Sequence, residues 1–80
     1  MTVGHVVIRY RRRLGMTQDE MAEALGVTKA SISAWEHDKT RPSLKTLYRL
    51  RRDYPKGDWR RDLALEIMDE SPYFDIAYPE

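Results

Sequence analysis

The three residues 26–28, Gly-Val-Thr, limit the fold of this chain more than any other segment. Before them, the sequence Thr-Gln-Asp-Glu at 17–20 has the capping-box pattern, in which a threonine oxygen accepts from a helix amide and a glutamate reaches back. The pattern predicts a helix over about 17–25, and the threonine before Lys29 begins a second helix over about 28–37. A three-residue turn makes these two helices cross steeply, because it is too short to lay them antiparallel.

Apolar periodicity predicts three further helices, over about 3–14, 43–53 and 59–69. The residues expected on their inner faces are Val3, Val7, Tyr10 and Leu14, then Leu44, Leu47, Tyr48 and Leu50, then Trp59, Leu63 and Ile67. At the end of the chain, apolar residues alternate with a period of two, which predicts an extended strand or arm. We therefore expect an all-α, five-helix domain over 1–70 and an extended C-terminal tail over 71–80.

Composition limits the class of protein. Eighty residues, 41% of them hydrophobic, are enough for one compact core but not for a second domain or a deep catalytic cleft. There is no cysteine, and His5 and His37 have no second ligand at metal-binding spacing, so neither a metal, a cofactor nor catalysis is expected. The longest apolar run, Val6-Val7-Ile8, is far too short for a membrane span or a signal-peptide core. We expect a soluble cytoplasmic protein without membrane contact.

Charge is distributed unevenly along the chain. All 14 lysines and arginines lie in residues 1–61 with seven of the 13 acidic residues, so this part carries +7. The last 19 residues hold the other six acidic residues and no basic one. This distribution favours a polyanion as the binding partner of the basic residues 1–61 and not of the acidic end of the chain. The alternative is a surface whose charge is merely uneven.

Several positions together resemble the helix-turn-helix domain of phage Cro and CI repressors and the related XRE-type bacterial regulators. They are Arg11, Gly15, Thr17-Gln18, Met21-Ala22, Leu25-Gly26-Val27-Thr28, Ile32-Ser33, Trp35-Glu36, Pro42-Ser43 and Leu47. The resemblance covers residues 3–54, about two-thirds of the chain. It implies a five-helix domain that reads double-stranded DNA, usually as a homodimer on a palindromic operator, and hence a transcriptional regulator acting as a repressor.

Short side chains mark the outer face of the predicted 28–37 helix. A helix that enters the major groove must bring its backbone near the base edges, so small residues permit approach and polar residues read bases. Lys29 can donate to guanine, Ser33 can donate or accept, and Ala30 or Ala34 can meet a thymine methyl. The resemblance implies base contacts by these four residues. The alternative is an ordinary solvated helix of small polar residues.

A second set of residues is expected at DNA phosphates: Thr17, Gln18, Thr28, Ser31, Lys39, Arg41 and Ser43. The role of Gln18 is implied by the family, whereas the two threonines are primarily helix caps. The resemblance also implies a structural ion pair between Arg11 and Glu36. Asp38 stands where the family often has glycine, so a positive backbone φ is expected there.

Two function hypotheses remain: a DNA-binding regulator, and a protein-interaction module that keeps the helix-turn-helix scaffold, such as an antitoxin-like neutraliser or an adaptor. The position of the basic residues favours the regulator, and the aromatic tail keeps a protein partner open. Because the end of the chain is acidic and apolar, it is the expected dimer interface. Its predicted residues are Trp59, Leu63, Ile67, Phe74, Ile76 and Tyr78. The competing prediction is that the tail folds back to complete its own core.

Overall fold

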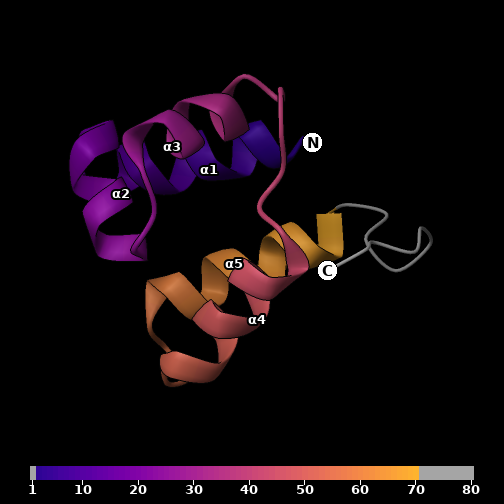
Figure 1. Cartoon of the computed structure of the whole chain (residues 1–80). Coiled ribbons are helices and arrows are strands. Elements are labelled where there is room, and N and C mark those ends of the chain that lie inside the picture. Colours follow the sequence, from indigo (N-terminus) through magenta and orange to yellow (C-terminus); the bar gives the residue numbers. More distant parts are fainter. Residues whose placement is uncertain (1, 71–80) are drawn as a thin grey trace. The chain divides into compact units, whose positions relative to one another are not determined.

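A computed structural model describes residues 2–70 of the chain. These residues form five α-helices and no strand (Figure 1). The helices are α1 (Val3–Arg13), α2 (Gln18–Leu25), α3 (Lys29–Glu36), α4 (Leu44–Asp53) and α5 (Trp59–Glu70). The all-α prediction is confirmed, and each predicted helix boundary lies within one residue of the observed one. The predicted extended tail lies outside the described residues.

Hydroxyl caps begin the first four helices. Their side-chain oxygens each accept a hydrogen bond from the backbone N–H three residues later: Thr2 from His5, Thr17 from Glu20, Thr28 from Ser31 and Ser43 from Thr46. In α2 the Glu20 carboxylate also accepts from the Thr17 N–H at 2.8 Å, which completes the predicted capping box. Since the first amides of a helix have no partner within it, each cap satisfies a donor and fixes the first helical residue.

The ends of the first three helices use the left-handed backbone region. Gly15 follows α1 with φ 67°, and Gly26 ends α2 with φ 70°. Asp38, two residues beyond α3, has φ 56° and is the single non-glycine residue with positive φ among the described residues. The prediction for this aspartate is confirmed. Glycine has no Cβ to clash in this region, and aspartate tolerates the region better than most residues.

The chain divides into two compact units between Arg41 and Pro42. In the first unit α3 packs against both α1 and α2, and in the second α4 packs against α5. The buried apolar residues of the first unit are Val3, Val6, Val7, Tyr10, Met21, Ala22, Leu25, Ile32 and Trp35. Those of the second are Leu47, Leu50, Leu63, Ala64, Ile67 and Met68. Burial of each larger side chain contributes about 1.5 to 3 kcal/mol toward folding.

Two residues expected on inner faces are exposed instead. Leu14, the C-cap residue of α1, is 39% exposed although its N–H still donates to the Tyr10 carbonyl at 3.0 Å as in the helix. Tyr48 is 40% exposed on α4, where the Arg51 guanidinium lies 5.1 Å from its ring centroid. The cation therefore covers a ring that the apolar pattern alone assigned to the interior.

None of the helices within residues 2–70 has the length and apolar character needed to cross a membrane.

Candidate nucleic-acid interface

The junction between α2 and α3 is fixed by backbone hydrogen bonds around Gly26. The Val27 N–H donates to the carbonyl of Ala22 at 2.9 Å, and the Gly26 N–H donates to that of Glu23 at 3.2 Å. These bonds close the last turn of α2, and Thr28 then begins α3 at once. The predicted three-residue turn is confirmed, and Figure 1 shows the short loop that joins the end of α2 to the start of α3.

The outer face of α3 carries short side chains, while its inner face is anchored. Ile32 and Trp35 are buried at 0% and 6% exposure. Lys29 and Ala30 are exposed, and Ser33 and Ala34 are half-buried. The four predicted base-contacting residues therefore lie on the accessible part of one helix. The side chains of Ala30, Ser33 and Ala34 are short, so a DNA surface could approach the helix backbone closely at these positions.

Lys29 is held only weakly in the unbound protein. Its Nζ lies 3.9 Å from a carboxylate oxygen of Asp19, and the two side chains are 61% and 74% exposed. An ion pair this exposed contributes about 0 to 1 kcal/mol, because water and salt screen both charges. A phosphate or a guanine edge can therefore replace Asp19 as the partner of Lys29 at little cost.

A charged hydrogen-bond network connects α1, α2 and the end of α3. Arg11 donates from Nε to Glu36 Oε2 at 2.6 Å and from a terminal nitrogen to Glu36 Oε1 at 3.2 Å. Arg11 also donates to the Met16 carbonyl at 3.1 Å. Gln18 Nε2 donates to the same Glu36 Oε1 at 3.1 Å. The implied ion pair between α1 and the end of α3 is present, and Gln18 joins α2 to it.

The network sets the protonation of its members. Burial, with the Glu36 side chain 5% exposed, acts to raise the pKa of this carboxyl. Hydrogen bonds from Arg11 and Gln18, together with the charge of Arg11, outweigh burial and lower the pKa of Glu36 below its ordinary value. The hydrogen bond to Glu36 raises the pKa of Arg11. The pair is therefore ionised and bidentate, a geometry that a lysine in place of Arg11 would not reproduce.

The predicted phosphate-contacting residues in the first unit differ in how many hydrogen-bond donors they keep. Gln18 uses one amide N–H on Glu36, so one N–H of its side chain remains. The Thr28 hydroxyl donates to Ser31 Oγ at 3.0 Å, which leaves the Ser31 hydroxyl hydrogen as the available donor of that pair. Lys39 and Arg41 are exposed in the segment after α3.

In the second unit, the Ser43 hydroxyl donates to Thr46 Oγ1 at 3.1 Å and accepts from the Thr46 N–H at 3.1 Å. A phosphate contact by this hydroxyl would have to replace the first of these bonds.

Comparison with known proteins agrees with this architecture. Residues 7–56 match the helix-turn-helix family, and this segment is more than half of the chain. The chain belongs to the XRE-type helix-turn-helix family. An uncharacterized HTH-type transcriptional regulator of Methanothermobacter thermautotrophicus is 40% identical over 47 residues, which are 59% of this chain and 68% of that protein. No solved structure matches the chain significantly.

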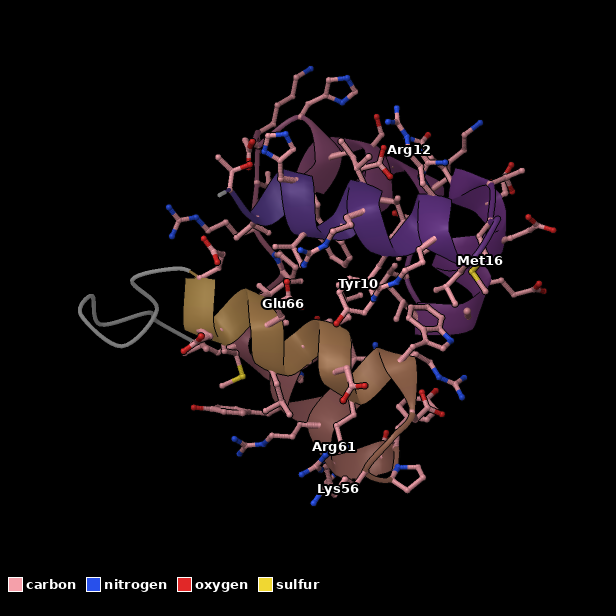
Figure 2. All side chains as sticks on the ribbon, turned by 180° about the vertical axis from the view of Figure 1, so that it is seen from behind. Tyr10, Arg12, Met16, Lys56, Arg61 and Glu66 are labelled. Carbon is pink, nitrogen blue, oxygen red and sulfur yellow. The ribbon has the colours of Figure 1, made fainter. Side chains whose placement is uncertain are left out.

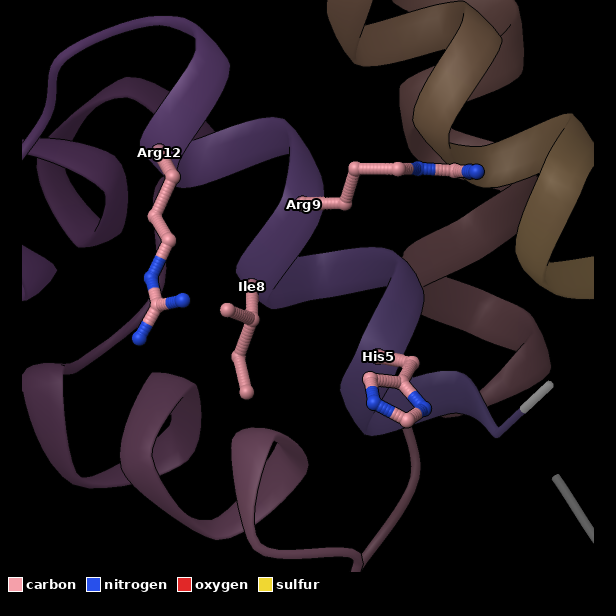
Figure 3. A pocket seen from close by; sticks show the side chains of 4 residues that line it. All are labelled: His5, Ile8, Arg9 and Arg12. Atoms are coloured by element: carbon pink, nitrogen blue, oxygen red, sulfur yellow. The ribbon is translucent and has the colours of Figure 1, made fainter.

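Family membership does not explain a surface pocket on α1. Its lining residues are His5, Ile8, Arg9 and Arg12. Figure 3 shows that the side chains of His5, Ile8 and Arg12 leave one side of the helix, whereas Arg9 leaves another. The residues that line the pocket all belong to α1, a helix other than α2 and α3. None of its residues was predicted to bind DNA.

The predicted dimer residues of this XRE-type chain have different surroundings. Leu63 and Ile67 are each 1% exposed, so their side chains are core residues within one chain and offer no apolar area to a partner. Trp59 is half-buried, and on the same helix Leu65 is 39% exposed. The other predicted members, Phe74, Ile76 and Tyr78, lie outside the described residues. An interface on α5 would therefore involve Trp59 and Leu65 rather than the two buried residues.

Besides the bond from Gln18 to Glu36, sequence reasoning missed a contact between α1 and the segment after α3. The Gly4 N–H donates to Asp38 Oδ1 at 3.0 Å, across 34 residues. The glycine in the first turn of α1 was a signal, because glycine weakens a helix and its missing side chain allows close approach of another segment. Within residues 2–70, no group of three histidine, cysteine or acidic side chains is arranged to hold a metal ion.

Proposed function

We propose that this XRE-type chain is a double-stranded-DNA-binding transcriptional regulator that places α3 in the major groove. The observation that carries the proposal is the division of α3 into an anchored and an accessible side. Ile32, Trp35 and Glu36 hold the helix to α1 and α2, while short side chains occupy the accessible side. A helix held in this way can bring its backbone close to base edges without losing its own packing.

Base contacts are assigned to Lys29, Ala30, Ser33 and Ala34. Lys29 leaves its weak pair with Asp19 and donates to guanine O6 or N7. The methyl groups of the alanines meet thymine methyls, and the Ser33 hydroxyl donates or accepts. Because this set lacks the glutamine, asparagine or arginine that gives bidentate readout, DNA shape and bridging water supply part of the specificity.

Phosphate contacts are assigned to residues around this helix. The remaining N–H of Gln18, the hydroxyl hydrogen of Ser31 and the cations of Lys39 and Arg41 are the main donors. Thr17 and Thr28 contribute chiefly by capping α2 and α3. Ser43, the cap of α4, is also assigned a phosphate contact, for which its hydroxyl would give up the hydrogen bond that it donates to Thr46.

We further propose that the regulator is a repressor and binds a palindromic operator in the cytoplasm as a homodimer. One eight-residue recognition helix reads only a few base pairs, so operator affinity requires two copies about 34 Å apart on the DNA. Residues 1–70 are assigned to the DNA-binding domain and 71–80 to a dimerisation arm. Sedimentation of the chain shortened to residues 1–70 tests the arm, since a shortened chain that still dimerises with undiminished affinity would remove that assignment.

The test of DNA binding combines selection and salt titration. Selection of bound sites from random duplex DNA should return an inverted repeat, which would establish the reader and the dimer together. Affinity for a generic duplex should fall by roughly 0.9 log units per log unit of salt for each phosphate contact. A flat response to salt, with no enriched sequence, would refute DNA binding and favour the protein-interaction module.

A further inference from the structure

Two contacts tie the same side of α1 to the end of α3. Gly4 and Arg11 are seven residues apart, which is two helical turns, so they lie on one stripe of α1. Arg11 holds Glu36, the last residue of α3, and Gly4 holds Asp38, two residues further on. The direction in which the chain leaves α3 is therefore set at two points.

The contact at Gly4 is a close approach of backbone to backbone. A Cβ atom at this position would lie 2.6 Å from the carbonyl oxygen of Glu36 and 2.8 Å from that of Trp35. It would also lie 3.0 Å from Asp38 Oδ2. Since two of the three atoms are backbone and cannot rotate away, any side chain at position 4 would displace the end of α3.

Asp38 has two tasks at this point. Its N–H donates to the Trp35 carbonyl at 3.0 Å, and the Lys39 N–H donates to the Ala34 carbonyl at 2.9 Å, which is the Schellman pattern that ends a helix. The left-handed residue of this pattern is usually glycine, and here it is Asp38 with φ 56°. The carboxylate accepts the otherwise unpartnered Gly4 N–H in the first turn of α1, where the helix dipole favours a negative charge.

We propose that Asp38 is a positioning residue that presets the segment 39–41 for phosphate contact. Glycine would adopt the same φ without strain, so the aspartate side chain is needed for its bond to α1 rather than for the turn. Lys39 and Arg41 follow directly and are exposed. By fixing the start of this segment in the unbound protein, the bond reduces the conformational freedom that phosphate binding must remove. The inference depends on the proposed DNA-binding function.

The first experiment tests the bond itself. Amide hydrogen exchange of the uniformly labelled 80-residue chain is compared for the wild type, Asp38→Gly and Asp38→Asn. Asparagine tolerates the same φ and keeps a side-chain oxygen, so it should retain slow exchange at Gly4, whereas glycine should lose it. Equal protection of the Gly4 amide in all three proteins would overturn the proposal.

The second experiment tests positioning by a double-mutant cycle on a fluorescent random-sequence DNA duplex. Lys39→Ala should weaken binding about fivefold in the wild type but less than about twofold in Asp38→Gly, because an unpositioned lysine contributes less. Asp38→Asn should restore the full effect of Lys39→Ala. Circular dichroism at the same temperature verifies that each variant is folded, so the readout is coupling rather than stability.

The outcomes separate this inference from the proposed function. If the wild type binds the duplex with a salt-dependent affinity and Lys39→Ala costs the same factor in both backgrounds, only the positioning role of Asp38 is overturned. If Lys39→Ala has no effect in the wild type, there is no contact to position and the inference also fails. If the wild type does not bind duplex DNA, the proposed function fails first.

Discussion

Replacing Arg11 by methionine should destabilise the protein strongly at neutral pH and much less in acid. Glu36 is 5% exposed and would keep only the hydrogen bond from Gln18. Removing one partner of a buried pair costs about 3 to 5 kcal/mol, and we expect the lower end of this range because Arg11 itself is 20% exposed. A loss of about 3 kcal/mol corresponds to about 12 to 24 °C in Tm for a domain of this size.

The pH dependence follows from the sign of the pKa change. In the wild type the pKa of Glu36 is lowered, so its contribution to stability is present above the ordinary value of 4.5 and is lost as pH falls through the folded-state pKa. Without Arg11, the lowering influences of its hydrogen bond and its charge are lost, and we expect burial to raise the pKa of Glu36. The variant then gains stability relative to the wild type as acid protonates Glu36, so the difference between the two proteins narrows toward about pH 4.

Urea unfolding followed by circular dichroism near pH 7 and near pH 4 measures this difference. Arg52→Met is the matched control, because Arg52 pairs with Asp53 at the surface with 73% of its side chain exposed and should cost less than about 1 kcal/mol. The double variant Arg11→Met, Glu36→Met should recover most of the loss, since no charge remains buried. A loss below about 1 kcal/mol for Arg11→Met, or one that does not change with pH, would refute the account of the network.

Three further predictions concern the turn, the reading helix and the second unit. Gly26→Ala should lower the free energy of unfolding by about 1 kcal/mol in thermal denaturation, because alanine is strained at φ 70°; an unchanged Tm would contradict this. Lys29→Ala should lower affinity for a selected site by ~1 to 3 kcal/mol in fluorescence anisotropy and reduce the preference for that site over random DNA. Lys56→Ala is its charge-matched control, since Lys56 extends to solvent from the α4–α5 loop (Figure 2); equal losses on both DNAs would argue against base reading. Hydrogen bonds with Arg60 lower the pKa of Asp58 to about 2. The ionised Asp58 therefore stabilises the folded protein above pH 3.8, and this stabilisation is lost as the pH falls toward about 2. In urea unfolding between pH 3.8 and about 2, the free energy of unfolding should therefore fall less for Asp58→Asn than for the wild type. The same pH dependence in both proteins would exclude this role of Asp58.

The helices could be predicted because their signals are local. Each cap and the residue whose amide it accepts are three positions apart, and the apolar stripes repeat within a few turns. The four candidate base-reading residues could likewise be proposed from one short segment. Exposure was harder to predict at Leu14 and Tyr48, because whether an apolar residue is buried depends on where its helix ends and on what covers it.

The sequence by itself determined the order of the helices, the three-residue turn that begins at Gly26 and the family of the chain. The tertiary structure alone decided that Gln18 donates a side-chain hydrogen bond to Glu36 and that the Gly4 N–H donates to Asp38. It also decided that Leu63 and Ile67 are buried within one chain. The physical reason is the range of the interactions. A cap or an apolar stripe involves neighbours in sequence, whereas a bond across 34 residues exists only after separate helices have packed and brought two backbones together.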